Sequence, residues 1–82
     1  MSIVNLRNME INQTGIVSSV NVSGELGRRI RDMGLTKGVA IAIQGRAPLF
    51  DPIAIRLRGF TLSLRNNEAD FIKVEVKDQE IN

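Results

Sequence analysis

The 82-residue sequence contains no cysteine and no histidine, and each absence excludes a class of chemistry. Without cysteine, neither a disulfide nor a thiolate metal site can stabilise so small a fold. Without histidine, the chain lacks the commonest metal ligand and the usual general base at neutral pH. Any metal site would consist of carboxylates, carbonyls and water, which favours Mg²⁺ or Ca²⁺ over tightly held iron or zinc. We therefore expect no metal site and no cofactor.

Tryptophan and tyrosine are also absent, which leaves Phe50, Phe60 and Phe71 as the only aromatic residues. Grooves for proline-rich peptides and platforms for single-stranded nucleic acid both depend on aromatic side chains, so neither use is favoured. The serines have no histidine to activate them, and the sequence contains no glycine-rich phosphate-binding motif. The composition indicates a packed binding module rather than an enzyme.

Long apolar runs are missing as well. The longest spans residues 39–43, whereas about 20 residues are needed to cross a bilayer. The first ten residues show neither the basic region nor the continuous apolar region of a secretory signal. We expect a cytoplasmic protein that does not insert into the membrane.

Alternating apolar residues predict about five short strands, separated by glycine and proline. In the first of them, Ile16, Val20 and Val22 share one parity, which Ser18 interrupts. In the strand at residues 39–43, the face opposite the large apolar residues carries the small side chains of Ala40 and Ala42. This suggests that the strand is covered on both sides. The predicted strands occupy residues 16–22, 39–43, 53–58, 60–65 and 72–77.

One segment, at about residues 24–33, has helical spacing because Leu26, Ile30 and Met33 follow at i, i+4 and i+7. Gly34 suits the left-handed position after a helix, and Leu35 could then fold back on Ile30 in a Schellman ending.

Gly27 within this helix costs about 1 kcal/mol relative to alanine, so we expect another stretch of backbone to approach it closely. Ser23 is the predicted N-cap, and Gly59 suits a tight hairpin turn. A second, short helical turn is predicted near residues 67–70. Together these elements predict a mainly β fold, a small antiparallel barrel in one domain at residues 1–77, with a polar tail at 78–82.

Charge is unevenly distributed although the net charge is only +2. Residues 28–65 contain eight basic residues against Asp32 and Asp51, whereas residues 66–82 contain five acidic residues against Lys73 and Lys77. Such a distribution indicates either an acidic partner or charge pairing within the chain.

The proline-framed segment GRAPLFDP at residues 45–52 predicts a long hairpin connection with an apolar tip, Leu49 and Phe50. Adjacent large apolar residues are unusual in an exposed loop. The tip therefore either folds onto its own barrel or serves as a docking knob.

Three segments, RRIRDMGLTKG (28–38), APLFDP (47–52) and LRNNEADFIKV (64–74), together resemble the FeoA family of ferrous iron transport proteins. The resemblance covers about residues 5–77. It departs from the family pattern at Phe50 and at Asn12, where glycine is usual. The motif residues to which it assigns a structural role are Met33, Gly34, Leu35, Gly38, Pro48, Asp51 and Pro52.

The resemblance implies an SH3-like barrel that serves as a cytoplasmic accessory of the membrane iron transporter FeoB, with the transporter's cytosolic G-protein domain as the contact. We expect the hairpin tip (Leu49 and Phe50) and two helix arginines (Arg28 and Arg31) to bind this partner, because interfaces usually combine an apolar anchor with a charged rim. Weak self-association through the tip is an alternative. A second hypothesis is a nucleic-acid-binding barrel that uses the basic residues Arg46, Arg56 and Arg58, although the missing aromatics disfavour it.

Overall fold

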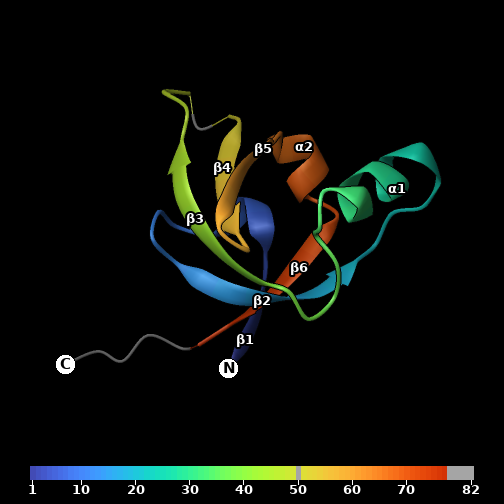
Figure 1. Cartoon of the computed structure of the whole chain (residues 1–82). Coiled ribbons are helices and arrows are strands. Elements are labelled where there is room, and N and C mark those ends of the chain that lie inside the picture. The colour runs from blue at the N-terminus through green and yellow to red at the C-terminus, as the bar shows by residue number, and fades with distance from the viewer. Residues whose placement is uncertain (50, 78–82) are drawn as a thin grey trace.

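Six antiparallel strands form one strongly curved sheet in the computed structural model, which describes residues 1–49 and 51–77 (Figure 1). Phe50 and the predicted tail at 78–82 lie outside the described residues. The strand order across the sheet is β1-β6-β2-β3-β4-β5. The strands are β1 (Ser2–Asn5), β2 (Thr14–Val20), β3 (Ala40–Arg46), β4 (Ile53–Leu57), β5 (Phe60–Leu64) and β6 (Ile72–Val76).

The concave face of this sheet holds the hydrophobic core. In β4 and β6 every second residue is buried, as the alternation of apolar residues predicts. Leu6 in the short 3₁₀ helix η1 (Leu6–Asn8) and Met9 just after it complete the core beside these strands. The fold is therefore mainly β, as predicted, with a core built from aliphatic side chains.

Strand β1 and helix η1 were not predicted. β1 has only four residues, and its Ile3 points outward with 56% of its surface exposed, so the strand has no alternation that a sequence pattern could reveal. It is added to the edge of the sheet by antiparallel pairing with β6, in which Ser2 lies opposite Val76. The sheet thus has six strands rather than about five.

The shared parity of Ile16, Val20 and Val22 does not correspond to one face of β2. Val17 is buried in β2, whereas Ile16 lies on the outer face and is 48% exposed. A bulge between Val17 and Ser19 shifts the register of β2 against β6, so one parity does not hold along the strand. The second face of β3 is also more open than predicted, because Ala40 is exposed and Ala42 is only half-buried.

Helix α1 (Gly24–Asp32) confirms the predicted helix and its ending. Gly34 has φ +98°, and its N–H donates to the carbonyl of Arg31 at 2.9 Å. The N–H of Leu35 donates to the carbonyl of Ile30 at 3.3 Å, which completes the Schellman motif and buries both side chains.

Two further helix predictions concern Gly27 and Ser23. A Cβ atom at Gly27 would lie 2.3 Å from the carbonyl oxygen of Val22, so the close backbone is the chain that leads into the helix. Ser23 occupies the N-cap position, but its hydroxyl makes no capping hydrogen bond.

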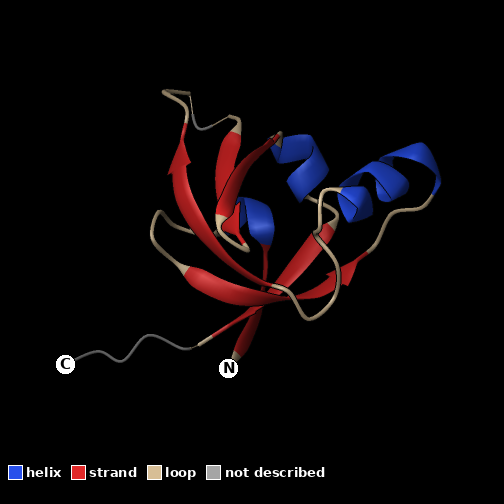
Figure 2. Cartoon of the chain, in the orientation of Figure 1, coloured by secondary structure: helices blue, strands red, loops and turns tan. Residues whose placement is uncertain are grey.

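The predicted short turn is helix α2 (Asn66–Ala69), which begins one residue earlier than expected. Figure 2 shows α1 and α2 on the same side of the sheet, next to the ends of β5 and β6. Within residues 1–49 and 51–77, no helix combines the length and the hydropathy that crossing a bilayer requires.

Candidate functional site

The apolar hairpin tip is exposed at Leu49, where 88% of the residue surface is accessible. Residues 47–49 extend beyond the ends of β3 and β4, away from the core (Figure 1). Leu49 lines a cleft of about 640 Å³ together with Met9 and Ile11 from the β1–β2 connection. Ile11 is a second exposed apolar side chain, and sequence analysis missed it because a single isoleucine before a turn carries no distinctive pattern. The structure thus presents Leu49 to solvent, while Phe50 lies outside the described residues.

The base of this hairpin is fixed by polar contacts. Arg46 donates from its guanidinium to the carbonyl oxygens of Arg7 and Met9, the latter at 2.7 Å, and to Asn66 Oδ1 at 3.5 Å. Asp51 Oδ1 accepts the backbone N–H of Asn66 at 2.9 Å. The motif residue Asp51 therefore joins the hairpin to the first residue of α2, which supports an exposed tip on a rigid base.

The arginines of α1 have three different environments. Arg28 is exposed and forms no ion pair with any residue in the described part of the chain. Arg31 donates to the carbonyl of Val22 at 3.0 Å, so its guanidinium holds the segment before the helix. Arg29 forms an ion pair with Glu68 of α2. Of the two arginines predicted to bind a partner, Arg28 is the one left available.

A groove of about 480 Å³ connects α1 with the hairpin. Met33 lines it on the helix side, and Asp51 and Pro52 line it on the hairpin side. These motif residues thus contribute to the surface as well as to the fold. The buried residue Leu35 and the positive-φ glycines Gly34 and Gly38, by contrast, shape the backbone, and Pro48 is exposed beside Leu49.

The three arginines of the nucleic-acid hypothesis do not form one surface. Arg46 is half-buried, and its guanidinium is engaged by the contacts at the hairpin base. Arg56 and Arg58 lie together at the end of β4, on the outer face of the sheet. No group of three or more histidine, cysteine, aspartate or glutamate side chains is placed to hold a metal ion within the residues that the structure describes.

Comparison with known proteins gives a consistent result. A family model described as the FeoA domain matches residues 4–76. The chain is 40% identical to an NMR structure of a FeoA-like protein from Clostridium acetobutylicum, with a TM-score of 0.87 over 100% of this chain and 95% of that one.

A curated relative is the Fe(2+) transport protein A/Fe(2+) transporter FeoB fusion protein of Porphyromonas gingivalis, 31% identical over 71 residues. The match covers 87% of this chain but only 8% of the length of that relative. A crystal structure of FeoA from Stenotrophomonas maltophilia, described as a prokaryotic SH3 domain protein, is 22% identical with a TM-score of 0.77 over 88% of this chain and 89% of that one. This last likeness confirms the SH3-like fold.

Proposed function

The chain belongs to the FeoA family, whose domain is associated with ferrous iron transport, and from this membership we propose that it is a cytoplasmic accessory protein that docks on the cytosolic G-protein part of a FeoB-type transporter. The proposed role is binding, without catalysis and without a resident cofactor. The partner is a protein, and the chain itself does not enter the membrane.

One observation carries the proposal: in the Porphyromonas gingivalis relative, a sequence like this one is joined to FeoB in a single polypeptide. Covalent linkage holds two modules at a high effective concentration, so a weak contact between them is maintained. A separate chain with the same surface must reach the same contact by binding. Binding between separate chains therefore favours a surface with a defined anchor over a diffuse electrostatic attraction.

The surface best suited to that contact runs from the hairpin tip to α1. Leu49 supplies an exposed apolar anchor on a base fixed by Arg46 and Asp51. Arg28 supplies a cation on the exposed side of α1 that forms no ion pair with the described residues, and the groove beside Met33 lies between the helix and the hairpin. An apolar anchor next to charged residues is the usual distribution of binding energy in an interface.

The test is an NMR titration of the isotope-labelled protein with the cytosolic domain of a FeoB-type transporter, with and without guanine nucleotide. We expect amide shifts at residues 47–49 and along α1. Leu49→Ser should weaken binding about tenfold or more, since burial of a leucine side chain contributes about 1.5–3 kcal/mol. Arg28→Glu should also weaken binding. The loss of affinity should be larger at low salt concentration, because a repulsive charge is screened least at low ionic strength.

Two control variants make similar changes at exposed residues outside this surface. Ile3→Ser removes an exposed apolar side chain from β1, and Lys37→Glu reverses an exposed positive charge outside α1. Both should bind as the unmodified chain does. Binding that is unaffected by Leu49→Ser and Arg28→Glu would contradict the assigned surface, and absence of binding in every nucleotide state would contradict the proposed function.

A further inference from the structure

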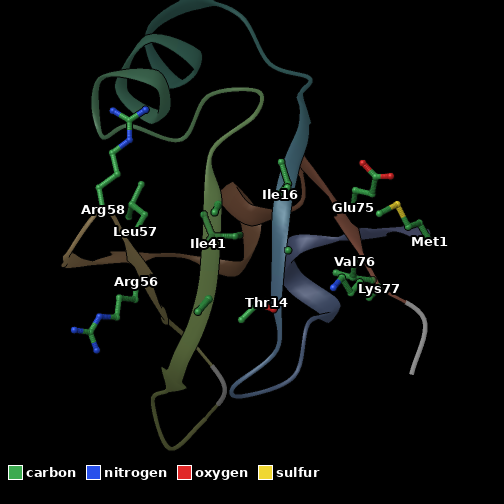
Figure 3. Close-up of a pocket in the computed structure, with 13 residues that line it drawn as sticks. Met1, Thr14, Ile16, Ile41, Arg56, Leu57, Arg58, Glu75, Val76 and Lys77 are labelled. Carbon is green, nitrogen blue, oxygen red and sulfur yellow. The ribbon is translucent and has the colours of Figure 1, made fainter. Parts of the chain in front are cut away.

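A second groove, of about 490 Å³, lies on the outer face of the sheet across β2, β3, β4 and β6 (Figure 3). Its floor consists of small or exposed apolar residues: Gly15 and Ile16 on β2, and Ala40 and Ala42 on β3. Ile16 is about half exposed, so apolar surface is accessible to solvent here. The small residues beside it let another backbone approach the sheet closely. Neither Leu49 nor any α1 residue lines this groove.

The walls of the groove carry a surplus of positive charge. Arg56 and Arg58 stand on one side of the floor, and Glu75 and Lys77 stand on the other (Figure 3). None of these four side chains forms an ion pair with another residue of the described chain. Three cationic side chains thus line the groove against one carboxylate, and no ion pair among residues 1–49 and 51–77 neutralises them.

Arg58 is held in a backbone conformation that does not favour arginine. It has φ +49° and, with Gly59 at φ +84°, forms the two-residue turn between β4 and β5. Such turns favour asparagine, aspartate and glycine because both positions have positive φ. The side chain has no ion-pair partner among the described residues that would explain its presence. An unfavourable residue at the rim of a groove points to a use of its guanidinium outside the chain.

We propose that this groove binds an extended acidic peptide segment that also carries bulky apolar side chains. Arg56 and Arg58 are two residues apart, and carboxylates on alternate residues of an extended chain are spaced about 7 Å apart on one side. The apolar residues between those carboxylates would point to the opposite side of the peptide, toward Ile16 on β2, while the peptide backbone lies over the alanines of β3. The site is separate from the surface of Leu49 and Arg28, so the two proposals stand or fall independently.

Two other occupants fit the groove less well. If a second copy of the chain bound here through the same groove, two positively charged surfaces would face each other, which is unfavourable. A nucleic acid would find two arginines, but none of the residues that line the groove is aromatic, so there is no platform for base stacking. An acidic peptide with apolar side chains is complementary both to the positive charge of the walls and to the apolar floor.

The experiment uses the full chain and three short capped peptides. The first alternates glutamate with leucine, the second alternates lysine with leucine, and the third alternates glutamate with serine. We expect the first to shift the amides of Ile16, Ala40 and Arg56 in NMR spectra and to bind at least about tenfold more tightly than the other two. Its affinity should fall as salt is added, since the charged contacts are exposed.

Variants with matched controls locate the site. Arg58→Asn removes the charge and keeps a residue suited to the turn, so weaker binding of the first peptide by about fivefold or more cannot come from a damaged fold. Lys37→Gln removes one exposed charge away from the groove and should leave the affinity unchanged. Ile16→Ser should weaken binding, whereas Ile11→Ser, at a similarly exposed isoleucine elsewhere, should not.

Several outcomes would overturn the proposal. Equal binding of the glutamate and lysine peptides would mean that the arginines do not select the ligand. The same amide shifts without peptide, increasing with protein concentration and lost in Arg58→Asn, would assign the groove to a second copy. Tighter binding of a single-stranded oligonucleotide than of the acidic peptide would assign it to nucleic acid. Shifts confined to residues that do not line the groove would place the peptide elsewhere on the protein.

Discussion

Arg29 of α1 and Glu68 of α2 form an ion pair that joins the two helices. Glu68 is 8% exposed, and its Oε1 also accepts the backbone N–H of Arg65 at 3.0 Å. The Glu68 carboxylate therefore caps the N-terminus of α2 and also binds α1 through Arg29. Because Met33 and Asp51 line the groove that these residues share, the ion pair also sets the geometry of the proposed docking surface.

Glu68→Gln should lower the free energy of unfolding by about 1–2 kcal/mol, because it replaces a charge-assisted capping bond and removes the ion pair. The effect stays modest because the Arg29 side chain is 57% exposed and water screens the pair. Urea unfolding measures it. Glu25→Gln, at an exposed residue in the first turn of α1, is the matched control and should change stability by less than about 0.5 kcal/mol. An effect of Glu68→Gln no larger than that of the control would contradict this role.

Gly27→Ala should destabilise the protein by about 1–3 kcal/mol, although alanine is the better helix former. The new Cβ would lie 2.3 Å from the carbonyl oxygen of Val22, which is backbone and cannot rotate away. Thermal unfolding provides the measurement. Gly45→Ala, where no atom lies within 4 Å of the added Cβ, should be nearly neutral. A stabilised Gly27→Ala variant would show that the segment before α1 moves aside without loss.

Arg58→Asn should raise the free energy of unfolding by about 1 kcal/mol, because arginine at positive φ is less favourable than asparagine there. The same variant loses affinity for acidic peptide, so stability and binding change in opposite directions. Chemical unfolding and the peptide titration, carried out on one sample, measure both. Arg56→Asn provides the contrast, since residue 56 lies within β4 and asparagine is unfavourable in strands. A fall in the stability of Arg58→Asn would contradict the interpretation of the turn.

Arg46→Lys should loosen the base of the 45–52 hairpin. Lysine keeps the charge but cannot reach two carbonyls and an amide oxygen with a planar fork. We expect a loss of about 1–2 kcal/mol in stability and faster amide exchange in the hydrogen bond from Ala47 to Pro52, while the amides of β6 stay protected. Uniform loss of protection along the chain would instead mean that Arg46 supports the whole fold.

Sequence reasoning succeeded where a residue pattern has one physical explanation. The alternation in β4 and β6 and the Gly34 ending of α1 follow from local periodicity and backbone conformation, so the sequence alone predicts them. It failed where the determinant is tertiary. The bulge after Val17 reverses the parity of β2, and no local pattern reveals a bulge.

The candidate sites show the same division. The hairpin tip at Leu49 could be predicted because adjacent apolar residues between prolines are unusual. The pairing of Arg29 with Glu68 could not, because nothing local links residues so far apart in the chain. The outer groove was also missed. Ala40 and Ala42 are equally consistent with a covered strand and with an open floor, and only the fold decides between them.

The pairing of β1 with β6 has a kinetic consequence. Ser2 lies opposite Val76, so this ladder closes a loop of nearly the whole chain, whereas the β3–β4–β5 meander joins neighbours through short connections. Closing a long loop costs more entropy than closing a short one, so we expect the meander to form before the rate-limiting barrier and β1 to add after it. Val4→Ala should then accelerate unfolding and leave the refolding rate almost unchanged. The last ladder to assemble would also be the first to open.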